Sequence, residues 1–255
     1  MRTLFILASF FALGACQSTT QKSDQTQTDT TAVIPDTVAQ TEKPSNFFVL
    51  TSWATTDRDK AMAHVPNQQK QLMGLWRKGL VENIYYNQKG KFADGQPMAL
   101  IGFFLKGLTE AEAHQALDTT DVVKTNLANY SLHPVGQSVF GRSDKALTVS
   151  AAGTGTYAVI WAFLVKRDSL DRAVLGEQAI LNAKLQREGV IENGYIDLRS
   201  LTAKAEGIQP AVYFINAKSE AEARHVLDAM PLVKSKQAVY GLHDVGQFLA
   251  GSTPN

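Results

Sequence analysis

The sequence predicts an α+β protein made of two tandem ferredoxin-like βαββαβ repeats, packed as an intramolecular pseudo-dimeric α+β barrel. The last third of the 255-residue chain repeats the middle third at a constant offset of 110 positions, from Gly79 and Gly189 to Gln137 and Gln247. About twenty paired residues are identical without a gap, well beyond chance. Each copy also shows the segment order of a split βαβ unit. A single copy would leave one apolar sheet face bare, and two copies can cover each other.

The elements of each copy follow from its local patterns. Apolar, β-rich runs predict first strands at 47–54 and 157–165. Helices are expected at 59–78 and 170–188, because each stretch is followed by a glycine that suits a helix C-terminus. The remaining strands are expected at 81–86, 98–105 and 127–135 in the first copy, and at 191–198, 211–215 and 237–245 in the second.

The second helix of each copy has the sharpest local signal. Thr109 to Glu112 and Ser219 to Glu222 both read as capping boxes, in which the hydroxyl and the carboxylate satisfy each other's backbone amides. The repeats are therefore placed at 46–137 and 157–248. Residues 138–156, with three glycines, are expected to be the linker between them.

The start of the chain, residues 1–15, is expected to be a lipoprotein signal peptide. A positive start precedes an apolar run of about ten residues, too short for a bilayer span of about twenty. Small residues then precede Cys16, the only cysteine. This resembles bacterial lipoproteins, which implies acyl chains such as palmitate on Cys16 and anchoring in a lipid bilayer. With Gln17 next, the resemblance implies the outer membrane, facing the periplasm. The alternative is an ordinary secretory signal with a chance cysteine.

Residues 16–45 are polar and are expected to form a disordered tether. The net charge is +1 with both signs interspersed, so nucleic acid is excluded as a partner. Because Cys16 is taken by lipid, thiol chemistry and cysteine-based metal sites are excluded as well. No cofactor and no metal are expected, and the folded body is expected to be monomeric.

Both copies resemble the YCII-related and muconolactone-isomerase-like group of the dimeric α+β barrel superfamily. The resemblance is carried by the segments LWRKGLVEN and LQREGVIEN, by EAEA followed by LD, and by DTTDVVK and DAMPLVK. The turn at Met230-Pro231-Leu232 is similar to the Leu-Pro-Leu turn of muconolactone isomerases. Asp121 falls where YCII-related proteins have an aspartate in a D-P-[FY]-V turn.

The chain departs from that family at its proposed acid–base pair. Gln68 and Gln178 stand where the first helix usually has a histidine, and Pro231 stands where the second copy would have the aspartate. The pair is therefore not carried over in either copy. His64 lies one helical turn from Gln68 and could substitute for the missing histidine beside Asp121.

Polar residues in the second strands are candidates for a binding pocket, namely Asn83, Tyr85, Asn193 and Tyr195. In a barrel these strands are largely buried, so a polar group on the inner face must be hydrogen-bonded. Asn83 and Tyr85 would share one strand face, with Glu82 on the other. The alternative is that the asparagine stabilises a bulge and the glutamate faces solvent.

His133 and His243 occupy equivalent places near the ends of the last strands. Tyr130 and Tyr240, two further candidates for the binding site, lie on the opposite strand face. A histidine titrates near neutrality and can act as acid, base or ligand. Asp244 beside His243 would favour the charged form and raise its pKa. The alternative is that both histidines only finish a strand. His114 and His225 are expected to be solvated helix residues.

Two functions remain open at this stage. The first is a membrane-anchored accessory protein that binds a small molecule or a partner, because the duplicated module lacks the family's histidine. The second is an isomerase or lyase on a small aromatic or lactone-like substrate, with His64, Asp121, His133 and His243 as catalytic candidates. A histidine within about 3 Å of a carboxylate inside a cavity would favour the enzyme.

Overall fold

The computed structural model describes residues 45–151, 154–165, 169–196 and 211–250. The signal peptide, Cys16 and almost all of the tether lie outside this part of the chain. The described residues belong to one compact unit, Glu42–Asn255. Its elements are β1 (Ser45–Trp53), α2 (Arg58–Arg77), β2 (Val81–Asn87), β3 (Leu100–Leu108), α3 (Glu110–Asp118), α4 (Asp121–Lys124), β4 (Ala128–Pro134), β5 (Gln137–Phe140), α5 (Asp144–Ala151), β6 (Gly155–Phe163), α6 (Arg172–Arg187), β7 (Ile191–Ile196), β8 (Ala211–Ala217), α7 (Glu220–Asp228), α8 (Pro231–Lys234) and β9 (Ala238–Ala250).

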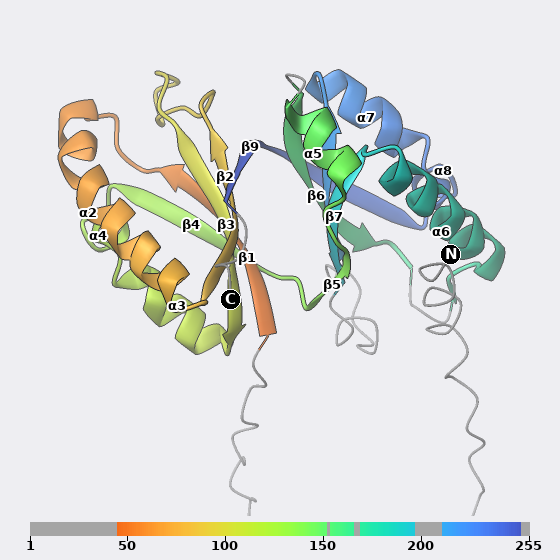
Figure 1. Cartoon of the computed structure of the whole chain (residues 1–255), viewed down its shortest axis with the longest axis horizontal. Coiled ribbons are helices and arrows are strands. Elements are labelled where there is room, and N and C mark those ends of the chain that lie inside the picture. Colours follow the sequence, from red (N-terminus) through yellow and green to blue (C-terminus); the bar gives the residue numbers. More distant parts are fainter. Residues whose placement is uncertain (1–44, 152–153, 166–168, 197–210, 251–255) are drawn as a thin grey trace, which may run out of the picture. The chain divides into compact units, whose positions relative to one another are not determined.

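The strands form one sheet in the order β4-β1-β3-β2-β9-β6-β8-β7-β5 (Figure 1). The strands β4-β1-β3-β2 of the first half and β9-β6-β8-β7 of the second half follow the same order. In each half the last strand of the repeat pairs with the first strand of the repeat. Each quartet is therefore a ferredoxin-like sheet, and β2 pairs with β9 to join the halves. The outer strands β4 and β5 are separated by only Val135 and Gly136. The sheet thus returns to its own beginning, which confirms the predicted α+β barrel class.

Two equivalent glycines allow each last strand to change partners. β9 pairs with β6 up to Gly246 and with β2 from Gln247 onward, while β4 pairs with β1 and β5 pairs with β7. Gly136 and Gly246 both have positive φ. A side chain at Gly246 would collide with the backbone of Tyr86, so only glycine fits this crossing. The repeated Val-Gly-Gln motif therefore closes the barrel.

The helices begin and end where the sequence indicates. α2 ends in a Schellman motif, in which Gly79 N bonds Trp76 O and Leu80 N bonds Leu75 O, and both Gly79 and Gly189 have positive φ. Thr109 and Glu112 form the expected capping box. The second box is only half formed: Ser219 accepts from Glu222 N, but the Glu222 carboxylate accepts from Lys218 N, one residue before the cap.

The expected linker over 138–156 contains more structure than its glycines indicated. It holds β5, which extends the second half's sheet, and α5, whose carbonyl at Ala146 accepts from buried Asn216. The short helices α4 and α8 were also not predicted. Both follow a sharp turn, and four residues are too few to show a helical period in the sequence.

The apolar clusters of the described residues include an inner core and an outer core. The inner core lies between the two half-sheets and draws on both, with Phe48, Tyr85 and Phe104 from the first half against Tyr195 and Phe214 from the second. An outer core of the first half lies between its sheet and the helices α2 and α3. Figure 1 shows α2 and α3 on one face of the first half's strands, and α6 and α7 on one face of the second's. None of the described helices is both long and apolar enough to cross a bilayer.

Candidate functional site

The strand asparagines and tyrosines meet in the inner core, where they form a hydrogen-bonded cluster across the two halves. Asn83 sits at the predicted bulge in β2, with φ of 48°, and its Nδ2 donates to the Tyr195 hydroxyl at 2.5 Å. The Tyr85 hydroxyl donates to Glu192 Oε1 at 3.0 Å. Asn193 Nδ2 donates to the Tyr195 hydroxyl at 3.3 Å. Four of the sequence candidates are therefore brought together.

Arg142 and Glu192 form the centre of this cluster. Glu192 belongs to the Glu-Asn pair that both copies share in their second strands, whereas Arg142 stands in no repeated pattern of the sequence. Arg142 follows β5, and its Nη2 lies 2.6 Å from Glu192 Oε1 and 3.0 Å from the Tyr85 hydroxyl. The Glu192 side chain is 1% exposed, and its Oε2 accepts from Thr156. Burial and the nearby Glu192 charge raise the pKa of Tyr85 well above its ordinary value, so Tyr85 stays a neutral donor.

The equivalent carboxylate in the first half, Glu82, has other partners. Its Oε2 lies 2.9 Å from Lys106 Nζ, and its Oε1 accepts from the Tyr195 hydroxyl at 3.4 Å. Glu82 does not simply face solvent, because its side chain is 13% exposed. The polar groups of the inner core thus bond to one another and bridge the halves. This arrangement stabilises the barrel and leaves little capacity for a ligand.

Tyr130 and Tyr240 lie away from that cluster, on the helix side of the last strands. The Tyr130 hydroxyl donates to Asp118 Oδ1 at 2.6 Å, and the Tyr240 hydroxyl donates to Asp228 Oδ1 at the same distance. His114 Nδ1 also contacts the Tyr130 hydroxyl, so this histidine is not merely solvated. The paired bonds tie α3 to β4 and α7 to β9.

His133 and His243 face the inner side of the strands, opposite Phe48 and Ala158 in the ladders. Partial burial and the charge of His133 lower the pKa of His243. The expected rise caused by Asp244 is therefore wrong. The Asp244 carboxylate instead accepts from Gly246 N, which holds the strand crossing. His133 Nε2 lies 3.0 Å from Ser131 Oγ.

His64 and Asp121 form a direct pair. His64 Nδ1 on α2 lies 2.7 Å from Asp121 Oδ2 at the start of α4, with side chains 29% and 22% exposed. This hydrogen bond lowers the pKa of Asp121, so the carboxylate stays ionised. Gln71 Oε1 accepts from Asp121 N at 2.8 Å and fixes the turn. An ionised carboxylate on Nδ1 leaves Nε2 of His64 as the ring atom open to another molecule.

The two glutamines at the family's histidine positions have different surroundings. Gln178 is buried, accepts from Leu232 N at 3.2 Å and donates to Asn182, so it holds α8 against α6. The Oε1 atom of Gln68 is buried and has no hydrogen-bond partner among the described residues. Neither glutamine forms an acid–base pair, and His64 is the histidine that reaches Asp121.

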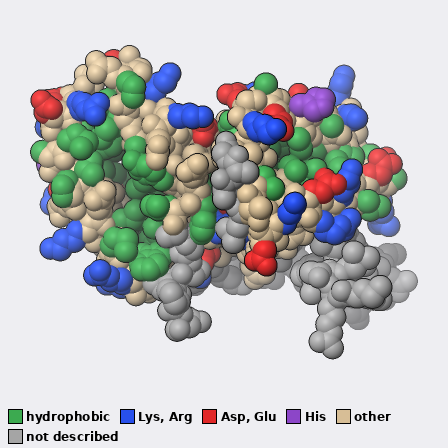
Figure 2. Space-filling view, turned by 45° about the horizontal axis from the view of Figure 1, so that its top comes forward, with side chains coloured by type: hydrophobic (Ala, Val, Ile, Leu, Met, Phe, Trp, Pro, Cys, Tyr) green, Lys and Arg blue, Asp and Glu red, His purple; other side chains and the backbone are tan. Residues whose placement is uncertain are grey.

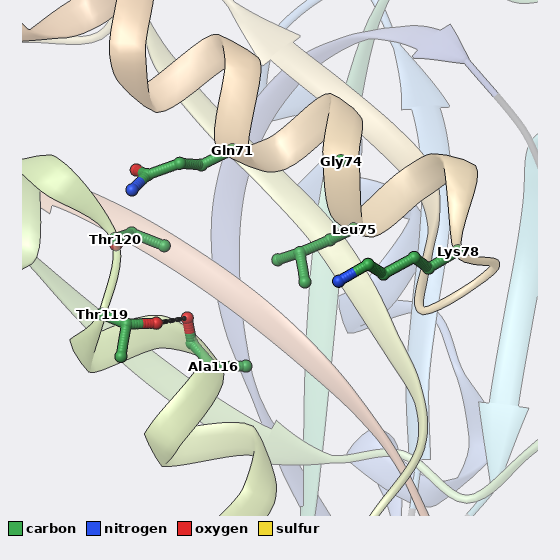
Figure 3. A pocket seen from close by; sticks show the side chains of 7 residues that line it. All are labelled: Gln71, Gly74, Leu75, Lys78, Ala116, Thr119 and Thr120. Carbon is green, nitrogen blue, oxygen red and sulfur yellow. Dashed lines mark hydrogen bonds between the residues drawn. The ribbon is translucent and has the colours of Figure 1, made fainter.

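A pocket of about 180 Å³ opens beside this pair, between α2 and the end of α3. We call it the α2–α3 pocket. Figure 3 shows the side chains that face it, from two sides of the gap. Its lining residues are Gln71, Gly74, Leu75, Lys78, Ala116, Thr119 and Thr120. Gln71 lines the pocket and also holds Asp121, and Thr120 immediately precedes Asp121. Gln71 and Thr120 therefore connect the pocket to the His64–Asp121 pair, which does not itself line the pocket.

The second half does not repeat this site. At the offset of 110, His64 and Asp121 correspond to Val174 and Pro231. Thr120 corresponds to Met230, which is fully buried and contacts Gln178. In the sequence, Gly74 inside a predicted helix is the one signal that points toward the pocket, because glycine is unfavourable in a helix interior.

The described residues contain no cluster of three or more His, Cys, Asp or Glu side chains that could hold a metal ion. On the face shown in Figure 2, basic and acidic side chains are interspersed. The chemistry available at the α2–α3 pocket is therefore hydrogen bonding, one lysine charge and the His64–Asp121 pair.

No protein-family profile matches the chain, and no curated protein sequence matches it. Among solved structures it is similar to a chlorite dismutase-like protein, with a TM-score of 0.48 and 10% identity over 81% of this chain and 95% of that one. It is also similar to the chlorite dismutase of Candidatus Nitrospira defluvii in complex with imidazole, with a TM-score of 0.46 and 12% identity over 83% and 92%. At TM-scores below 0.5, neither resemblance carries an argument about activity.

Proposed function

We propose that this chain is an envelope lipoprotein in which two YCII-like repeats form one barrel, and that the first repeat binds a small molecule. The observation that carries the binding function is the α2–α3 pocket, to which the His64–Asp121 pair is connected through Gln71. Anchoring through Cys16 in the outer membrane, facing the periplasm, is part of the same proposal and rests on the sequence.

Structural differences between the two halves support this proposal. The inner-core polar groups are committed to bonds between the halves, including Arg142 to Glu192 and Asn83 to Tyr195. The second half places buried Met230 where the first has Thr120. The second repeat therefore completes the barrel, and the first repeat keeps a partly open polar surface.

The binding function is tested by ligand-observed NMR with a mixture of small acids, amides, lactones and phenols added to the Glu42–Asn255 unit. Gly74→Leu places a side chain in the pocket, and the structure has no atom within 4 Å of the new Cβ that would strain the helix. We expect binding to be lost in this variant. Gly176→Leu on α6 is the matched control, because Gly176 is also helical and open. Equal binding by both variants would exclude this pocket.

A second candidate function is an isomerase or lyase that uses His64 and Asp121 on a small aromatic or lactone-like substrate. It is favoured by the 2.7 Å contact, which gives the histidine an orienting carboxylate. Such an enzyme would exchange a substrate C–H proton with solvent. Loss of a ligand's C–H signal in D₂O, abolished by His64→Gln with binding retained, would support catalysis. Binding of a ligand without exchange of its C–H proton would contradict the enzyme function and support the binding function.

A further inference from the structure

The α2–α3 pocket has a distinct electrostatic character that the second half lacks. Lys78 lines it, and no ion pair involving Lys78 is found among the described residues. The residue four positions earlier, one helical turn away, is Gly74, which offers no side chain. A cation thus stands at the rim of a pocket with no neighbour on its own helix to neutralise it.

In the second half, the same two positions carry side chains of opposite charge that form an ion pair. Gly74 corresponds to Lys184, and Lys78 corresponds to Glu188. Lys184 Nζ lies 3.9 Å from Glu188 Oε1, so the charges cancel across the surface that the pocket occupies in the first half. The first half therefore lacks both a side chain at the position of Lys184 and an acid at the position of Glu188.

The remaining lining residues set the size and polarity of a ligand. Leu75 and Ala116 offer an apolar wall, while Gln71 and Thr120 offer polar groups. Gln71 uses its oxygen to hold Asp121 N, which leaves its amide nitrogen as a donor on the Thr120 side of the pocket. The volume of about 180 Å³ is below that of pockets for drug-sized ligands, which begin near roughly 300 Å³.

We propose that the α2–α3 pocket binds a small monocarboxylic acid, with the carboxylate at Lys78 and the hydrocarbon part against Leu75 and Ala116. This deepens the proposed binding function and rests on it. The acid's body would then lie near Gln71 and Thr120, which connect the pocket to the His64–Asp121 pair.

The test uses two matched probe pairs on the ¹⁵N-labelled Glu42–Asn255 unit at low ionic strength, where charge effects are least screened. Benzoate is compared with benzamide, and butyrate with butyramide, by titrating backbone amide shifts. We expect shifts at Gln71, Leu75 and Thr120, with each acid bound roughly three- to fivefold more tightly than its amide, as for an exposed ion pair. The shifts should be absent at Leu181, Leu185 and Met230.

Lys78→Gln should abolish the preference for the acids, while Lys70→Gln, an exposed lysine on the same helix outside the pocket, should leave it unchanged. Gly74→Lys combined with Lys78→Glu installs the pair of the second half and should abolish binding with the fold retained. Equal affinity for acids and amides would overturn the ligand class and leave the binding function standing. If no probe shifts the pocket amides of the wild type, the acid as ligand is overturned, and the binding function falls as well only if the wider mixture with lactones and phenols also fails to bind. If the preference persists in Lys78→Gln, the role of Lys78 is wrong.

Discussion

Arg142 Nη2 lies 2.6 Å from Glu192 Oε1, so a residue from the connection between the halves is bonded to a strand deep in the second half. The Arg142 guanidinium also lies over the Phe248 ring, with Cζ 3.3 Å from its centroid, and Phe248 belongs to the stretch of β9 that pairs with β2. One side chain therefore contacts β7, β9 and, through the Tyr85 hydroxyl, β2. Arg142 therefore connects strands of both halves through one side chain.

Removing this guanidinium should be strongly destabilising. Arg142→Met leaves Glu192 buried without its cation, and breaking a buried pair costs about 3–5 kcal/mol. The free energy of unfolding, measured by urea denaturation, should fall by that amount. Adding Glu192→Gln should recover part of the loss, because the neutral amide can still bond Tyr85 and Thr156.

Lys184→Met is the control for this prediction. It breaks an ion pair whose side chains are 61% and 50% exposed, and such pairs contribute at most about 1 kcal/mol. If Arg142→Met and Lys184→Met both lower the free energy of unfolding by at most about 1 kcal/mol, Arg142 does not hold the halves together.

The closed strand order predicts how the body assembles. The Glu42–Asn255 unit should be monomeric, because each half covers the apolar inner face of the other. A single repeat, residues 46–137, would expose Phe48, Tyr85 and Phe104 and should dimerise or aggregate. Light scattering after size-exclusion chromatography distinguishes these states. A stable monomeric single repeat would show that the halves are independent domains.

Most of the fold could be predicted because apolar strand runs, helix-ending glycines and the 110-residue repeat all indicate the same elements. Apart from β9, which continues five residues past its expected end to pair with β2, the expected strands and long helices lie within three positions of their observed bounds, and Gly79 and Gly189 end their helices as expected. The repeated His-x-Val-Gly-Gln motif suggested a site at its histidine, but its glycine is required where the last strand changes partners. Repeats preserve folding requirements as readily as functional ones.

The candidate site could be predicted only in part. His64 was considered as a substitute because it lies one turn from Gln68, and the structure brings it to Asp121. Arg142 could not have been found, because it lies in a non-repetitive connection and its partner Glu192 is 50 positions away. Aligning the two copies shows that Gly74 and Lys78 differ from their counterparts in the second copy. Only the structure shows that these two residues line a pocket between α2 and α3.

Cys16→Ser tests the proposed anchor. Two or more acyl chains hold a protein stably on a membrane where one is marginal, so the variant should move from the membrane to the soluble fraction or remain unprocessed. Fractionation and uptake of labelled palmitate are the measurements. A variant that stays with membranes, together with a wild type that takes up no label, would contradict the lipoprotein assignment.

The final prediction concerns the pH response of His243, whose pKa lies below its ordinary value of 6.5 because of partial burial and, second, the charge of His133. In the unfolded chain both causes vanish, so near that pH the unfolded state binds more protons at this site than the folded state. The contribution of neutral His243 to stability is therefore present above pH 6.5 and is lost as the pH falls toward the folded value.

A ¹H NMR titration of the His243 ring should give a midpoint below 6.5 in the wild type. In His133→Gln the midpoint should rise only part of the way back, because burial remains. His243→Gln should flatten the fall in unfolding free energy between pH 6.5 and the folded midpoint. If His243 instead titrates above 6.5, Asp244 outweighs burial and the arrangement of the two histidines across the inner face does not set the pKa.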